Sequence, residues 1–332
     1  MPYGYTGTTL QVDLSNRKIE IEENDETFYR NYLGGRGVGY RYLLKQVPAG
    51  TDPFAPENIL VLATGVMTGS PLAASCRFAA VGKSPLTGAA GESEAAGFFG
   101  PELKKAGFDA IVFQGKSEKP VYLWVNDGKA ELKDATELAT LGARELEDAI
   151  RDEMGSSKIR VAQTGLAGMN GVLYANITNN LGNFNGRNGM GALMGSKNVR
   201  AVAALGSQKI EFADLDYLRQ TAKEYAKTFR NNPAGEALHV YGTTAFPEIL
   251  SAAGALPVNN FRRSALDEAA LIGGDTYNEI LLNKRKGCHA CPIQCKRGVA
   301  LDDPKYGIDS RYGGPEYETI AALGSNLNIT NL

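Results

Sequence analysis

The chain has 332 residues, of which 43% are hydrophobic, and a formal net charge of −2 at pH 7. This length accommodates about two domains with sizeable cores. A charge so close to zero gives no reason to expect a nucleic acid or a membrane surface as partner. No apolar run reaches the ~20 residues of a membrane span. We also expect no secretory signal, because the first residues lack a basic region followed by an apolar stretch.

Cysteine usage points to a reducing compartment. Only four cysteines occur, and three of them lie within eight residues of one another. A disulfide framework would scatter them along the chain. We therefore expect a cytoplasmic protein, from a cell that tolerates oxygen-sensitive metal centres.

The first ~210 residues predict a mixture of strands and helices. Residues 9–14 and 18–22 predict one hairpin, and residues 121–125 and 129–132 predict another around Asp127-Gly128, a type I′ turn pair. Further strands are expected at 59–63, 78–81, 110–113, 159–162, 172–177 and 199–204, and helices at 27–33, 137–153 and 189–197. This many strands with hairpins indicates an antiparallel or mixed α+β domain rather than a doubly wound one.

Helical spacing dominates after about residue 212. Helices are expected at 215–230, 245–253, 276–284 and 315–323. The cysteine run is expected on a loop between two of these helices, because Pro292 argues against a continuous helix there. We place the domain boundary between residues 210 and 211. The last residues have no tail character, so we expect the chain to be a piece of a larger protein.

Two glycine-rich segments imitate nucleotide-binding motifs without matching them. Residues 34–39 (GGRGVG) lack the G-x-G-x-x-G spacing and follow a helical rather than a strand pattern. Residues 189–197 end in Gly-Ser-Lys, whereas a P-loop needs Gly-Lys-Ser/Thr. Both nucleotide sites are therefore rejected, and close helix packing explains the small residues.

The strongest chemical signal is the C-x2-C-x3-C run of Cys288, Cys291 and Cys295. Zinc sites usually add a second cysteine pair or a histidine pair, and the chain has only two histidines. A [4Fe–4S] cluster therefore fits better than zinc or free thiols. Cys76 is the only other cysteine and could be the fourth ligand, but a lone cysteine among small residues is usually an apolar filler.

Eight short segments, taken in order, carry a family resemblance. They are residues 33–37 (LGGRG), 83–88 (KSPLTG), 97–100 (GFFG), 107–111 (GFDAI), 194–198 (MGSKN), 241–243 (YGT), 288–295 and 314–318 (GPEYE). Each is weak alone, but together they are specific. On these segments the chain resembles the tungsten-containing aldehyde:ferredoxin oxidoreductase family over all 332 residues.

The resemblance implies an α+β fold. Mixed β-sheets of an N-terminal domain (1–210) would form a saddle under a bis-molybdopterin cofactor that holds tungsten or molybdenum. A mainly helical domain carrying the [4Fe–4S] cysteines (211–332) would follow, truncated. A magnesium ion would bridge the two pterin phosphates. Members are about twice as long, and their fourth cluster cysteine lies in the half that is absent, which favours truncation over ligation by Cys76.

The resemblance also assigns residues around the pterin. Arg77 matches an arginine between pterin and cluster, where its planar fork suits a phosphate or a cluster sulfur. The alternative is a surface ion pair. Glu94, Ala96 and Gly97 match a phosphate loop in which the family commonly has asparagine at position 94. A carbonyl contact to magnesium would survive that change, and a carboxylate could bind the ion directly.

A second phosphate loop matches Asn183, Phe184, Gly186 and Arg187. The family usually has arginine at position 183, so Asn183 removes one cationic contact, while Arg187 remains. For Gly186 the alternative is simple turn chemistry.

Glu318 matches a glutamate near the metal, where it would activate water or accept a proton. The alternative is an ordinary glutamate on a helix surface. Glu316 lies two residues away on another helix face, so only one of the two should point at the metal.

The activity implied by the resemblance is oxidation of an aldehyde and water to a carboxylate. Electrons would pass through pterin and cluster to ferredoxin or a partner subunit, within a homo-oligomer or multisubunit complex. Two alternatives stay open. One is a family member with another substrate, such as an aromatic thioester that it reduces. The other is an iron–sulfur electron-transfer or assembly subunit without tungsten.

Overall fold

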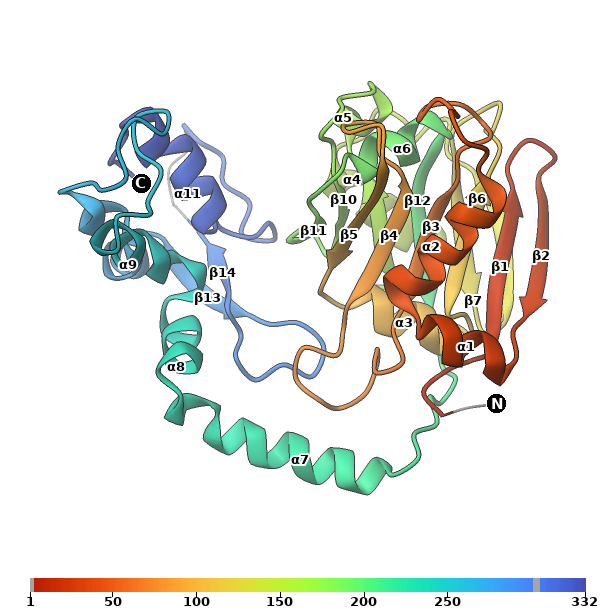
Figure 1. Ribbon diagram of the computed structural model, residues 1–332, viewed down its shortest axis with the longest axis horizontal. Helices are drawn as coiled ribbons and strands as arrows, with labels where there is room; N and C mark the ends of the chain where they lie inside the picture. The colour runs from red at the N-terminus through yellow and green to blue at the C-terminus, as the bar shows by residue number, and fades with distance from the viewer. Residues whose placement is uncertain (1–2, 301–304) are drawn as a thin grey trace. The chain divides into compact units, whose positions relative to one another are not determined.

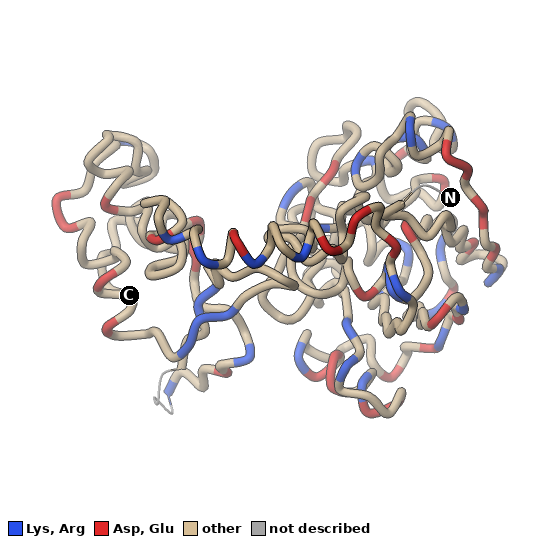
Figure 2. Tube along the Cα trace, turned by 90° about the horizontal axis from the view of Figure 1, so that it is seen from below, with Lys and Arg blue, Asp and Glu red and all other residues tan. Residues whose placement is uncertain are grey.

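The computed structural model describes residues 3–300 and 305–332. The chain divides into two compact units, Met1–Arg219 and Gln220–Leu332. The division falls inside helix α7 (Leu215–Thr228), a little after the predicted boundary at residue 210. No helix of the described part is both long and apolar enough to cross a membrane. Figure 2 shows acidic and basic residues interspersed along the trace of both units.

The first unit contains two six-stranded mixed sheets (Figure 1). The first sheet has the order β2 (Lys18–Glu23), β1 (Thr8–Asp13), β6 (Ala110–Gln114), β3 (Leu60–Thr64), β4 (Phe78–Lys83) and β5 (Ala90–Ala95). Strands β1 and β6 run parallel, and the other neighbours run antiparallel. Strand β5 is therefore an edge strand.

The second sheet has the order β11 (Asn183–Asn185), β10 (Ile177–Asn179), β9 (Arg160–Thr164), β12 (Val199–Leu205), β7 (Val121–Asn126) and β8 (Lys129–Asp134). Here β12 and β7 are the parallel pair. Strand β11 lies at one edge of this sheet. Mixed sheets with intervening helices confirm the predicted α+β class.

One core joins the two sheets. It contains residues of β1, β3, β4 and β6 together with residues of β7, β9 and β12, and α3 (Phe99–Lys105) and α6 (Met190–Ser196) contribute to it. Helix α2 (Gly35–Gln46) covers the other face of the first sheet, and α4 (Ala143–Glu153) covers that of the second. Because both faces are covered, central strands such as β3 are buried at every position. Short helices α1 (Glu26–Tyr32) and α5 (Leu166–Met169) complete the unit.

The second unit is built mainly of short helices. They are α8 (Pro233–Val240), α9 (Phe246–Ala252), α10 (Gly274–Ile280) and α11 (Tyr317–Leu323). A two-stranded hairpin of β13 (Leu282–Lys286) and β14 (Lys296–Val299) lies among them. Its core gathers Leu256, Val258, Ile272, Tyr277 and Val299.

Both hairpins predicted from the sequence are confirmed, including positive φ at Asp127 and Gly128. Three predicted elements are wrong in part. The strand predicted at 172–177 begins only at Ile177, because a turn precedes it, and helix α4 begins at Ala143, after turns over residues 136–140. The helix predicted at 276–284 ends at Ile280, because residues 282–286 pair with β14 instead.

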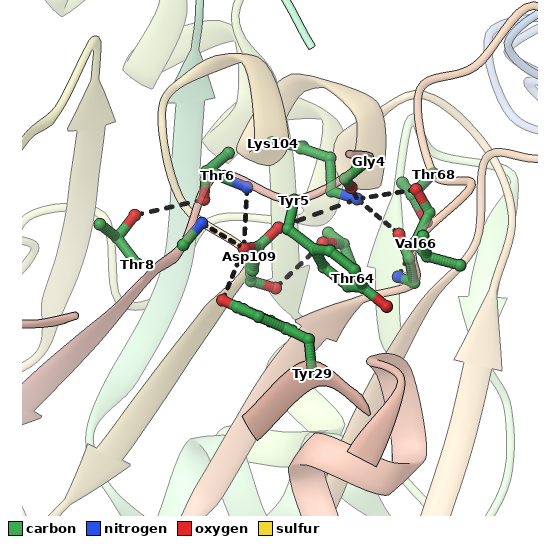
Figure 3. Close-up of polar contacts among 12 residues, drawn as sticks. Gly4, Tyr5, Thr6, Thr8, Tyr29, Thr64, Val66, Thr68, Lys104 and Asp109 are labelled. Atoms are coloured by element: carbon green, nitrogen blue, oxygen red, sulfur yellow. Dashed lines mark hydrogen bonds and ion pairs between the residues drawn. The ribbon is translucent and has the colours of Figure 1, made fainter. Parts of the chain in front are cut away.

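A buried ion pair fastens the N-terminal segment to the first sheet (Figure 3). Lys104 Nζ lies 3.8 Å from Asp109 Oδ1 and donates to the carbonyls of Gly4 and Gly65 at 2.6 and 2.5 Å. The other oxygen, Asp109 Oδ2, accepts hydrogen bonds from the Tyr29 hydroxyl and from the N–H groups of residues 6 and 7. Burial lowers the pKa of Lys104 to about 8, against the opposing attraction of Asp109.

Replacing Lys104 with methionine should destabilise the first unit strongly. The Asp109 carboxylate would stay buried without its cation, which costs about 3–5 kcal/mol of unfolding free energy. Urea denaturation measures this loss. The exposed Lys129→Met variant is the control and should change stability by no more than about 0.5 kcal/mol. Equal stability of the two variants would show that the ion pair does not hold the segment.

Candidate functional site

The two predicted phosphate loops are brought together at the free edge of β5. Asparagine side chains from the segment between residues 179 and 188 donate to β5 and the loop after it: Asn179 to Ala96 O at 3.1 Å, Asn185 to Ser93 O at 2.7 Å and Asn188 to Glu92 O at 2.7 Å. We call these three residues the asparagine ladder. An edge strand otherwise leaves backbone groups unpaired, so the ladder provides donors for two carbonyls of β5 and joins the 183–187 loop to this edge.

Gly97 lies in a tight cradle where the two loops meet. Its φ is +107°, and an added Cβ would come within 2.3 Å of Asn179 Oδ1 and 3.0 Å of Asn183 Nδ2. The next residue, Phe98, donates its N–H to Asn180 Oδ1 at 3.0 Å. Several side-chain amides thus face the backbone of one glycine. The Oδ1 atoms of Asn179 and Asn185 are buried without a hydrogen-bond partner among the described residues.

Charged groups gather beside this junction. Glu94 Oε1 lies 3.4 Å from a guanidinium nitrogen of Arg36, and Glu94 Oε2 lies 4.0 Å from one of Arg77. Arg36 also pairs with Glu92 at 3.2 Å. Arg77 keeps 56% of its side chain exposed, so its fork remains accessible to an added anion.

Arg77 and Glu94 line a cavity of about 290 Å³, together with Gly65 and Thr68. Thr68 Oγ1 donates to Arg77 O at 2.8 Å and accepts from Gly65 N at 2.9 Å. Gly65 O is in turn a hydrogen-bond acceptor of Lys104. The buried ion pair of Figure 3 therefore supports the loop on which Arg77 is presented.

The three clustered cysteines lie in the loop of the β13–β14 hairpin, not between two helices as the sequence predicted. The loop is compact: Cys291 N donates to Cys288 O at 3.2 Å, and Ala290 and Gln294 have positive φ. All three cysteines are half-buried. Cys76, in contrast, is buried in the first unit, which fits the apolar-filler interpretation.

Cys288 and Cys291 belong to the electrostatic surroundings of Cys295. Burial raises the pKa of Cys295 most, and Glu316, Cys288 and Cys291 raise it further, while Lys296 opposes them. Among the residues described, however, no three His, Cys, Asp or Glu side chains converge as they would around a metal ion. An iron–sulfur cluster is usually held by four cysteine thiolates, of which this loop could supply three. The cysteine side chains would therefore have to rearrange for the three sulfurs to surround one cluster.

Of the two candidate glutamates, Glu316 contacts the cysteine hairpin. Glu316 Oε1 is 2.5 Å from Lys296 Nζ, and its other oxygen accepts from Thr243 Oγ1 at 3.4 Å. Glu318 is exposed in the first turn of α11. The proton role of Glu318 stays a prediction.

The predicted site residues fall into two groups, one in each compact unit. Arg77, Glu94, Ala96, Gly97, Asn183, Gly186 and Arg187 lie around the β5 edge, with Phe184 about half exposed beside them. The cysteines and Glu318 belong to the second unit. Sequence reasoning missed Arg36 and the asparagine ladder. Only the frequency of asparagine between residues 179 and 188 could have signalled the ladder.

With this geometry in hand, comparison with known proteins gives a consistent result. Residues 9–206 match the family model "Aldehyde ferredoxin oxidoreductase, N-terminal domain", and residues 220–332 match "Aldehyde ferredoxin oxidoreductase, domains 2 & 3". The chain belongs to the aldehyde ferredoxin oxidoreductase family, a family of oxidoreductases.

Individual relatives agree. The chain is 40% identical over 331 residues to the tungsten-containing aldehyde ferredoxin oxidoreductase of Pyrococcus furiosus, covering 99% of this chain and 54% of that protein. It is 30% identical over 352 residues to the WOR-like subunit of an aliphatic sulfonate oxidoreductase from the same organism, covering 98% of this chain and again 54% of the relative. The chain thus spans about half the length of the curated relatives it matches.

A solved structure shows the same fold. The active site complex BamBC of benzoyl coenzyme A reductase, in complex with 1,5-dienoyl-CoA, matches with a TM-score of 0.82 and 30% sequence identity. The match covers 93% of this chain and 48% of that one.

Replacing Gly97 with alanine should open the junction of the two loops. The left-handed φ costs a non-glycine residue about 1–3 kcal/mol, and the new Cβ would also collide with Asn179. Gly155→Ala is the matched control, because its φ is +71° but nothing lies within 4 Å of the added carbon. Denaturant unfolding should show the larger loss for Gly97→Ala. Equal losses of stability in the two variants would mean that the contact of the new Cβ with Asn179 has no steric cost.

Proposed function

We propose that this chain supplies the pterin-binding and cluster-binding parts of a tungsten (or molybdenum) bis-pterin oxidoreductase that converts aldehydes to carboxylic acids. The observation that carries the proposal is the junction at β5. Two loops more than 80 residues apart in the chain, each matching a phosphate loop, meet beside an exposed arginine, in a chain that also presents three thiols on one hairpin. Family membership supports the same conclusion.

The cofactor would bind through the residues of this junction. Arg77 and Arg187 offer guanidinium forks to phosphate oxygens, and the backbone around Gly97 and Gly186 allows close approach. Glu94 would hold magnesium through its carbonyl or its carboxylate, because oxygen ligands suit that ion. Two-electron exchange with the substrate is the chemistry that the bound tungsten would supply.

The second unit would carry electrons and protons away. Cys288, Cys291 and Cys295 would supply three ligands of a [4Fe–4S] cluster, and ferredoxin or a partner subunit would take the electrons. Glu318 would accept the proton released as water adds to the aldehyde. We expect the complete enzyme to work in the cytoplasm, as a homo-oligomer or in a multisubunit complex.

A second candidate substrate has one specific observation in its favour. The structural match to a benzoyl coenzyme A reductase complex is nearly as extensive as the sequence match to aldehyde oxidoreductases. Turnover of an aromatic coenzyme A thioester, with no aldehyde turnover, would select reduction of that thioester over aldehyde oxidation.

Metal content tests the cofactor assignment directly. In full-length protein purified without oxygen, Cys291→Ser should lose most of its iron, because a hydroxyl is a poor substitute for a thiolate ligand. Cys76→Ser is the matched control and should keep it. Tungsten or molybdenum should be present alongside the iron. Iron without either metal would favour an iron–sulfur subunit instead, and zinc without iron would refute the cluster.

Glu318→Gln tests the proton role. The amide keeps the shape of the side chain but cannot accept a proton, so aldehyde turnover should fall about 10²- to 10⁴-fold, the usual contribution of a general base. Iron and tungsten contents should not change. Steady-state assay with a ferredoxin or a dye acceptor measures the loss. Parental turnover in Glu318→Gln would remove this residue from the mechanism.

A further inference from the structure

Arg297 is a buried cation that bridges a helix end and the cysteine loop. Its side chain is 1% exposed. Its guanidinium donates to Val240 O at 2.9 Å and His239 O at 3.0 Å, which are carbonyls at the end of α8. It also donates to Gln294 O at 2.9 Å, and its Nε lies 3.4 Å from Cys295 O. One planar fork therefore fixes the last residues of the loop to α8.

Two further contacts hold the same end of the loop. The His239 ring nitrogen Nδ1 lies 2.9 Å from Ile293 O, within hydrogen-bond distance. Gly242, at φ +66°, packs so closely that an added Cβ would lie 2.4 Å from Cys295 O. Residues 293–295 are thus held on several sides by the C-terminus of α8 and the turn after it.

The position of this cation has an energetic cost. In the hairpin register Arg297 lies directly opposite Arg285, and like charges opposite one another destabilise a β pair. Both guanidinium groups donate a hydrogen bond to the same carbonyl oxygen, His239 O. The distance from Arg285 Nε is 2.9 Å. The carbonyls at a helix C-terminus carry partial negative charge, which offsets the repulsion. A neutral side chain at position 297 would avoid the repulsion, but it would also lose the link to Gln294 and Cys295.

We propose that Arg297 is the positioning residue of the cysteine loop, holding Cys295 in place relative to Cys288 and Cys291 so that the three thiols can receive a cluster. This inference rests on the proposed iron–sulfur function. Ligands ordered in advance lose less conformational freedom when the cluster enters, which raises its retention. Arg297 acts through the loop backbone and does not itself bind iron.

The test uses full-length protein purified without oxygen, with the variants Arg297→Met and Arg297→Lys. The readouts are iron per chain, the rate of iron release to a chelator, and the electron paramagnetic resonance spectrum of the reduced cluster. Arg297→Met should release iron about 10- to 100-fold faster, the effect typical of residues that orient metal ligands. Arg297→Lys keeps the charge but lacks the fork, so it should retain more iron than Arg297→Met and show an altered spectrum.

Arg200→Lys is the matched control. Arg200 is equally buried and donates to backbone carbonyls, those of Thr164 and Leu141, but it belongs to the first unit. This variant should lose stability without changing the spectrum or the rate of iron release. If Arg297→Met fails to fold, Arg297→Lys decides the question. If Arg297→Lys and any folded Arg297→Met release iron at the parental rate and show the parental spectrum, the inference about Arg297 is wrong but the proposed function stands. If the unsubstituted protein itself never holds iron, both the inference and the proposed function are wrong.

Discussion

The free edge of β5 is the constraint on which the proposed cofactor-binding surface depends. Backbone groups at a strand edge must find partners, and here the asparagine ladder donates to three carbonyls of β5 and the loop after it. Because amide side chains are short, satisfying the edge pulls the segment after β10 against the loop after β5. Two loops distant in sequence become one surface, and Gly97 is the residue that lets them close.

Buried cations bonded to carbonyl oxygens recur through both units. Lys104 joins the N-terminal segment to the loop that presents Arg77. Lys197 donates to carbonyls of two loops of the first unit, those of Pro56 and Asn58 and that of Gly115. Arg297 joins α8 to the cysteine loop. A buried charge is costly unless its hydrogen bonds are satisfied. Each of these side chains meets that condition with several backbone acceptors, so each fixes segments that regular secondary structure leaves unconnected.

The sequence predicted what local patterns determine. Alternation around Asp127-Gly128 was sufficient for a hairpin, whereas the cluster that the cysteine spacing favours over zinc stays a prediction. The sequence did not predict the strand at residues 282–286. Three consecutive basic residues, Lys284, Arg285 and Lys286, hide the alternation of apolar and polar residues that identifies a strand. Nor could it predict the ladder or the contacts of Arg297 with the end of α8, because these join residues separated by more than 50 positions and depend on the assembled fold. The choice between Glu316 and Glu318 likewise depends on packing that no spacing reveals.

The proposed function requires that three thiols of one hairpin hold an iron–sulfur cluster in a protein that also binds a heavy metal through pterin. The most direct test is a crystal structure of the anaerobically purified full-length protein, with anomalous difference maps recorded at the iron and tungsten edges. We predict iron density bounded by the sulfurs of Cys288, Cys291 and Cys295, and tungsten density in the same molecule. A single zinc ion bound by these sulfurs, or no metal there at all, would contradict it.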